Sequence, residues 1–133
     1  MRRLTVILLL GALAAGCTPY DIEEILLDRS DVSVTMKGRE IYSYDPKNAQ
    51  IGFNSERNEY RVFDENFLNW FEITWDEKPS SQGQKISMDI EWGTKTGFRK
   101  EKGLEFEVRK TDDSGMIWLW NSSEKIGVTI KVF

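Results

Sequence analysis

The stretch KISMDIEW at residues 85–92 alternates apolar and polar side chains without a break. Ile86, Met88, Ile90 and Trp92 take every second position, and charged or hydroxyl side chains stand between them. Successive side chains of a β-strand point to opposite faces of its sheet, so this period of two predicts a strand with one buried and one wet face. In an α-helix the same charges would fall within the apolar stripe.

The same alternation recurs along the chain, which predicts an all-β, antiparallel fold. Strong strands are expected at residues 32–36, 85–92, 104–110 and 125–132, and weaker strands at about 40–44, 49–54, 59–64, 67–75 and 115–121. About eight or nine short strands separated by turn-forming residues are typical of a sandwich or a small barrel. We expect an antiparallel β-sandwich, immunoglobulin-like in architecture alone, with a small eight-stranded β-barrel as the alternative.

The amino terminus has a different pattern. Arg2 and Arg3 precede an apolar run at residues 4–15, and Ala-Ala-Gly then leads to Cys17, the single cysteine of the chain. The run is shorter than the roughly 20 residues that a membrane-spanning helix needs, and a charged start, a short apolar middle and small residues are typical of a secretory signal. Residues 1–17 resemble the lipobox signal of bacterial lipoproteins.

The resemblance implies that residues 1–16 are removed and that Cys17 carries a thioether-linked diacylglycerol, usually with an acyl chain on its amine. Thr18 follows the cysteine in place of the Asp that often retains lipoproteins in the inner membrane. We therefore expect an exported protein, lipid-anchored in the cell envelope at the bacterial outer membrane. The sequence does not decide between the periplasmic and the surface face of that membrane. A cleaved signal with a chance cysteine and an uncleaved anchor are the alternatives.

Behind the signal we expect a lipidated tether and short helix at residues 17–30, with Asp21 as the helix N-cap, and one all-β domain at residues 31–133. Removing residues 1–16 from the 133 leaves 117 residues, which is one domain of ordinary size. The loss of Arg2 and Arg3 lowers the net charge from −4 to −6. So acidic a domain is a poor candidate for nucleic acid, whose phosphates require clustered Lys and Arg.

The chain contains no histidine. Its absence excludes Ser-His-Asp and Cys-His catalysis and removes the commonest zinc ligand. With Cys17 acylated, no thiol remains for a disulfide or for catalysis. We expect a protein that is not an enzyme and holds no metal or cofactor.

Tryptophan side chains are the first candidates for ligand contact. Trp70 lies on the otherwise polar side of its strand, whereas Trp118 and Trp120 lie in MIWLW, a strand that is apolar on both faces. Exposed indole rings hold sugars by stacking on them, so all three residues are candidate ligand-binding positions. The alternative is that the rings fill the core of a domain without disulfides.

The segment GTKTGFRKEKG at residues 93–103 is expected to be a long loop with a local charge of +3. An aromatic side chain among basic ones can dock on anionic headgroups or on an acidic partner. The alternative is a solvated hairpin end. Its candidate contact residues are Lys95, Phe98, Arg99, Lys100 and Lys102.

Three functions remain open on this basis. The first is a non-catalytic, lipid-anchored binding or accessory module that contacts a protein partner or an envelope polymer. The second is a carbohydrate-binding domain that uses its tryptophans, and the third is a small lipid-anchored inhibitor or chaperone that acts through residues 93–103.

Overall fold

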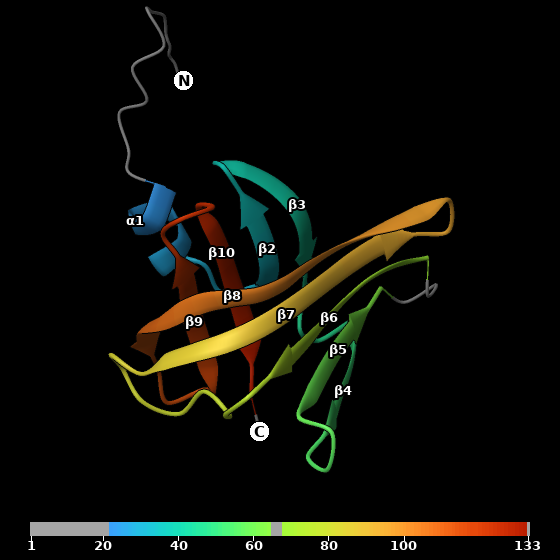
Figure 1. Ribbon diagram of the computed structural model, residues 1–133. Coiled ribbons are helices and arrows are strands. Elements are labelled where there is room, and N and C mark those ends of the chain that lie inside the picture. Colours follow the sequence, from blue (N-terminus) through green and yellow to red (C-terminus); the bar gives the residue numbers. More distant parts are fainter. Residues whose placement is uncertain (1–21, 65–67, 133) are drawn as a thin grey trace, which may run out of the picture.

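The computed structural model describes residues 22–64 and 68–132 (Figure 1). The expected signal segment, Cys17 and Asp21 lie outside these residues. The described elements are α1 (Ile22–Leu27), β2 (Val32–Met36), β3 (Arg39–Tyr44), β4 (Gln50–Asn54), β5 (Glu59–Phe63), β6 (Asn69–Trp75), β7 (Lys85–Thr94), β8 (Gly97–Thr111), β9 (Met116–Asn121) and β10 (Ile126–Lys131).

All nine strands form one antiparallel sheet in the order β3-β2-β10-β9-β8-β7-β6-β5-β4. Strands β4 to β10 follow one another as a meander, and the β2–β3 hairpin joins this meander by pairing β2 with β10. The all-β, antiparallel class is therefore confirmed. The sandwich is wrong, because the strands make a single sheet that curls into a half-barrel (Figure 1).

Irregular pairing accounts for much of this curl. The register shifts between Val34 and Thr35, between Met88 and Ile90, and between Val108 and Lys110. Such bulges bend a strand and increase its right-handed twist, so a sheet that contains several of them wraps over its own inner face. One sheet can then supply both sides of a core that a sandwich would build from two.

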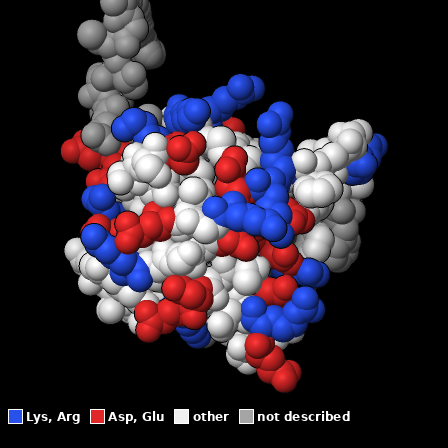
Figure 2. Space-filling view, in the orientation of Figure 1, with Lys and Arg blue, Asp and Glu red and all other residues white. Residues whose placement is uncertain are grey.

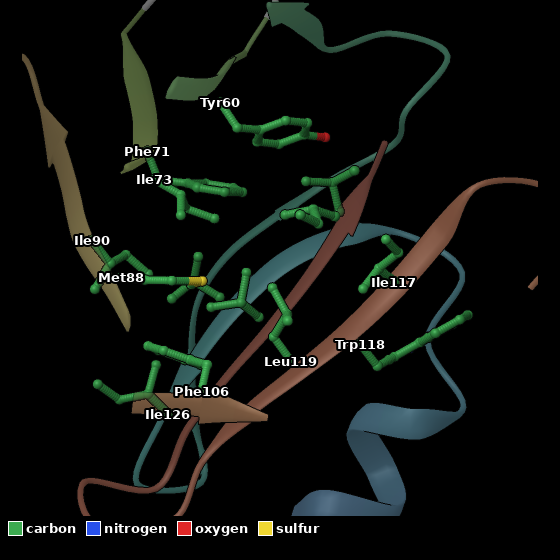
Figure 3. Close-up of a cluster of buried hydrophobic side chains, with 14 of the residues drawn as sticks. Tyr60, Phe71, Ile73, Met88, Ile90, Phe106, Ile117, Trp118, Leu119 and Ile126 are labelled. Atoms are coloured by element: carbon green, nitrogen blue, oxygen red, sulfur yellow. The ribbon is translucent and has the colours of Figure 1, made fainter. Parts of the chain in front are cut away.

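The core occupies the inside of the curl. Figure 3 shows side chains of β5, β6 and β7 on one side, among them Tyr60, Ile73 and Met88, facing Leu119 of β9 on the other. These four side chains are at most 1% exposed. The alternation that predicts β7 therefore places its apolar side chains correctly, although they face another part of the same sheet.

Side chains join β3, at one edge of the sheet, to β6 and β7, with which it has no backbone pairing. Tyr42 Oη of β3 donates a hydrogen bond to the carbonyl oxygen of Gly93 in β7 at 2.8 Å. The rings of Tyr44 and Phe71 lie 5.8 Å apart between β3 and β6. These contacts place β3 across the open side of the half-barrel, next to the inner face of β7.

Residues 93–103 are not a long loop, which corrects that part of the sequence prediction, but the end of a hairpin, which was the alternative. Strands β7 and β8 stay paired as far as Thr94 and Gly97, so the connection consists of Lys95 and Thr96 alone. The charged segment is the start of β8, and its hairpin with β7 projects beyond the rest of the sheet (Figure 1).

Candidate functional site

The outer part of the β7–β8 hairpin divides its side chains between two faces. Directly opposed residues of an antiparallel pair share a face, and successive residues alternate. Phe98 stands opposite Gly93 and Lys100 opposite Glu91, so both lie on the outer face. Arg99, which stands opposite the core residue Trp92, lies on the inner face.

An aromatic patch forms on the outer face. Trp70 of β6 stands opposite Gly93, and Gly93 in turn stands opposite Phe98, so the three residues lie in one row across three strands. The ring centroids of Trp70 and Phe98 are 6.4 Å apart with an interplanar angle of 35°. Phe63 of β5 stands opposite Trp70 and continues the row. We call Phe63, Trp70 and Phe98 the Trp70–Phe98 patch.

Gly93 makes this ring contact possible. A Cβ atom at this position would lie 2.8 Å from Trp70 Cζ2, from Phe98 Cβ and from the Gly97 carbonyl oxygen. Because glycine has no side chain, the two rings close over the backbone of β7. Phe98 nevertheless stays 67% exposed, and it is one of two large apolar side chains exposed in the described part of the chain.

A charged row borders the patch. Arg61 pairs with Glu72 between β5 and β6, and Lys100 Nζ lies 3.7 Å from Glu91 between β8 and β7. Between the rings and these ion pairs lies a depression of about 200 Å³. An apolar centre within a polar rim is the usual composition of a contact surface for a protein or a glycan.

Trp118 and Trp120 are buried, at 3% and 8% exposure. A Cβ at Gly127, the residue opposite Trp120, would collide with Leu26, so α1 covers this part of the sheet. The ammonium of Lys110 lies 5.0 Å from the centre of a Trp118 ring. These two rings therefore present no open face to a sugar, and Trp70 is the partly exposed indole among the three candidates.

The basic candidates are separated by the fold. Lys95 lies in the turn and Lys102 is exposed on β8, whereas Lys100 is engaged by Glu91. Arg99 points to the opposite face from Phe98 and lines a groove between β3 and the hairpin. The sequence therefore identified one cluster where the structure has two surfaces.

Tyr42 holds the hairpin to β3 as a neutral hydrogen-bond donor. Burial, and to a smaller degree the charge of Asp64, raise the pKa of its phenol. The hydroxyl therefore keeps its proton throughout the neutral range and donates it to the Gly93 carbonyl oxygen. The backbone beneath the Trp70–Phe98 patch is fixed by this bond.

Within residues 22–64 and 68–132, no group of three or more His, Cys, Asp or Glu side chains is placed to hold a metal ion. In the same residues, no helix has the length and apolar character needed to cross a bilayer. A scan against protein-family models, a search of curated proteins and a search of solved structures each find no match to this chain.

Proposed function

We propose that this protein is a non-catalytic binding or accessory module of the cell envelope, which contacts a protein partner or an envelope polymer through the Trp70–Phe98 patch. The observation that carries this proposal is the exposure of Phe98, 67%, in contact with a second aromatic ring. Aromatic side chains that are held rigidly and surrounded by polar groups are the commonest anchors of interfaces.

The location that we propose rests on the sequence of residues 1–17. A lipid on Cys17 anchors the exported protein at the outer membrane, and several acyl chains hold far more firmly than one. The test is Cys17→Ser, examined by metabolic labelling with a fatty acid and by fractionation of the envelope. We expect the variant to lose the label and to leave the membrane fraction, and a variant that keeps both would refute the anchor.

A carbohydrate is the second candidate ligand of the patch. The depression of about 200 Å³ beside Trp70 has charged groups on its rim, and a sugar ring needs both a stacking surface and hydrogen-bond partners. An inhibitor is the third candidate, because the hairpin projects from the sheet with a narrow two-residue tip.

The patch is tested by capture from the envelope of the same bacterium. Purified wild-type protein, Phe98→Ser and Phe98→Tyr are each immobilised, and the bound proteins and glycans are quantified. An interface anchor contributes about 2 kcal/mol or more, so Phe98→Ser should reduce capture by at least about tenfold. Phe98→Tyr, which keeps the ring, should retain it.

Lys102→Ser is the matched control, because Lys102 lies on the same strand and is exposed without belonging to the patch. We expect it to capture the same molecules as the wild type. Equal capture by wild type and Phe98→Ser would exclude the patch as the binding surface.

A further inference from the structure

A groove runs along the inner side of the β7–β8 hairpin, opposite the face that carries Phe98. It lies between this hairpin and the β2–β3 hairpin and has a volume of about 600 Å³. A second hollow of about 310 Å³ shares Trp92 and Arg99 with it and continues toward the hairpin turn. The lining of the larger groove is Met36, Lys37, Arg39, Glu40, Ile41, Trp92 and Arg99.

The position of the groove is set by the strands that form its two walls. Arg99 reaches it because this residue stands opposite Trp92 on the inner face. The hydrogen bond from Tyr42 to the Gly93 carbonyl oxygen fixes β3 against β7 beside the groove. Its two walls therefore come from strands distant in sequence, and their separation is set by the curl of the sheet.

The rim of the groove is positively charged. Lys37, Arg39 and Arg99 have no ion-pair partner among the described residues. Glu40, the acidic residue of the lining, forms an ion pair with Arg29. Figure 2 shows Lys and Arg side chains gathered on the upper part of the face that carries β8, although the whole chain has a net charge of −4.

Arg29 is itself held in place by acids, so Glu40 is neutralised by a fixed cation. Its guanidinium donates to both carboxylate oxygens of Asp31, at 2.7 and 2.5 Å, and the hydrogen bond with Asp31 raises its pKa. The lining acid therefore does not cancel the three free cations. The rim keeps a net positive charge at neutral pH.

The floor of the groove is apolar. Trp92 is 7% exposed, and Met36 and Ile41 are partly buried against the core. A bare anion would gain nothing from these side chains, and a neutral apolar molecule would gain nothing from the cations. The combination suits a molecule that has both parts.

We propose that this groove binds an anionic amphiphile, meaning a phosphate, sulfate or carboxylate group joined to a hydrocarbon or aromatic body. Arg99, Arg39 and Lys37 hold the anionic group, and the apolar body lies on Trp92. A lipid headgroup region and a free amphiphilic metabolite share this chemistry. The groove uses other side chains than the Trp70–Phe98 patch, because Arg99 and Phe98 lie on opposite faces of β8.

The test uses the purified full chain with Cys17→Ser, so that no acyl chain is attached. Octyl phosphate is titrated below its micelle concentration. Inorganic phosphate probes the anionic half of the ligand alone, and octyl glucoside probes the apolar half. Binding is measured by calorimetry, and the NMR signal of the Trp92 indole N–H locates it. We expect octyl phosphate to bind, to shift this signal, and to bind at least about tenfold more tightly than either half, because both parts contribute.

Two charge reversals separate the groove from the general charge of the hairpin. Arg99→Glu should weaken octyl phosphate binding by at least about tenfold, since it removes charge-assisted hydrogen bonds. Lys102→Glu makes the same change in net charge three residues away and should alter binding by less than about twofold. Arg39→Glu on β3 should repeat the loss, and this second variant decides the result if Arg99→Glu fails to fold.

Equal losses in Arg99→Glu and Lys102→Glu would overturn the proposal, as would equal affinity for octyl phosphate and either half probe, or no binding at all. Sedimentation with phosphatidylglycerol and phosphatidylcholine vesicles then identifies the source. Arg99-dependent sedimentation with the phosphatidylglycerol vesicles, and none with phosphatidylcholine, assigns a lipid, whereas octyl phosphate binding with no sedimentation on either vesicle assigns a free amphiphile. Phe98→Ser should keep octyl phosphate binding, so failure of the patch and failure of the groove are distinguishable.

Discussion

Replacing Gly93 by alanine should destabilise the protein through one added methyl group. The new Cβ would lie 2.8 Å from three atoms: the Gly97 carbonyl oxygen, Phe98 Cβ and Trp70 Cζ2. Carbon atoms in good contact are about 3.5–4.0 Å apart, so the neighbours must move by about 0.7 Å or more. Two of the three atoms belong to the backbone of β8 or lie next to it and cannot swing away alone.

The cost follows from overpacking. Forcing an extra carbon into a well-packed site costs about 1–3 kcal/mol. Replacing glycine by alanine also restricts the unfolded chain, and this effect alone raises the free energy of unfolding by about 0.4–1 kcal/mol. We therefore expect Gly93→Ala to lower the free energy of unfolding by about 1–2 kcal/mol and to lower the Tm by about 4–8 °C for a domain of this size.

Gly97→Ala and Gly52→Ala are matched controls. Both glycines lie in strands, and a Cβ at either position would have no atom within 4 Å. Urea unfolding followed by tryptophan fluorescence should show these two variants at or slightly above wild-type stability. If Gly93→Ala unfolds at the same urea concentration as Gly52→Ala, the close approach of Trp70 and Phe98 over β7 is refuted.

Three other substitutions and conditions test the packing. Tyr60→Phe removes the acceptor of the Lys131 N–H at 3.0 Å and should cost about 1–2 kcal/mol in urea unfolding. Burial raises the pKa of Tyr44 and of Tyr60 above the value in the unfolded chain, so stability is complete below about pH 10 and should fall at higher pH. Tyr60→Phe should reduce that alkaline slope, and an unchanged slope would contradict the assignment. Leu26→Ala should cost about 2–4 kcal/mol and make Trp120 more accessible to acrylamide quenching, because Leu26 of α1 is 2% exposed and lies over Gly127, the residue opposite Trp120.

The strands were predictable from the sequence because their signal is local. The alternation at residues 85–92 identifies β7 and selects the side chains that face inward, and each weaker strand predicted lies within a few residues of an observed one. Which other strands pack against the inward-facing side chains of a strand cannot be seen from its local sequence. Pairing of β2 with β10 joins the β2–β3 hairpin to the meander in one sheet, whereas the alternation of side chains would be the same in two stacked sheets.

The error at residues 93–103 has a related cause. Four cations within a short segment suggest a solvated loop, yet a projecting hairpin has water on both faces of its strands. Polar side chains on both faces are therefore compatible with continuous pairing, which extends to Thr94 and Gly97. The connecting residues Lys95 and Thr96 are not one of the pairs typical of two-residue hairpin turns, such as Asn-Gly or Asp-Gly, so the sequence carried no clear signal for a turn there.

The candidate tryptophans differ in what lies over them rather than in their own sequence context. From the sequence alone, Trp120 resembles a ligand-binding ring. In the structure it is covered by α1, which precedes it by about 95 residues. Trp70 is partly exposed, and its cross-strand neighbour Gly93 has no side chain, which lets Phe98 reach the indole ring. The contact between the two rings thus depends on a glycine, and a glycine has no side chain that would mark it in the sequence as part of a binding surface.

The same alternation gives the hairpin two surfaces of different chemistry. Phe98 and Arg99 are adjacent in the chain, yet one contacts Trp70 on the outer face and the other lines the groove beside Trp92. A module built this way can hold a partner with one side of a strand and an anionic amphiphile with the other. Both sites use the backbone of β8 between Gly97 and Glu101. A movement of the β7–β8 hairpin relative to Tyr42 of β3 would therefore alter the geometry of both sites. Octyl phosphate should therefore alter partner capture in the wild type, and Tyr42→Phe, which removes the bond to the Gly93 carbonyl oxygen, should weaken that dependence.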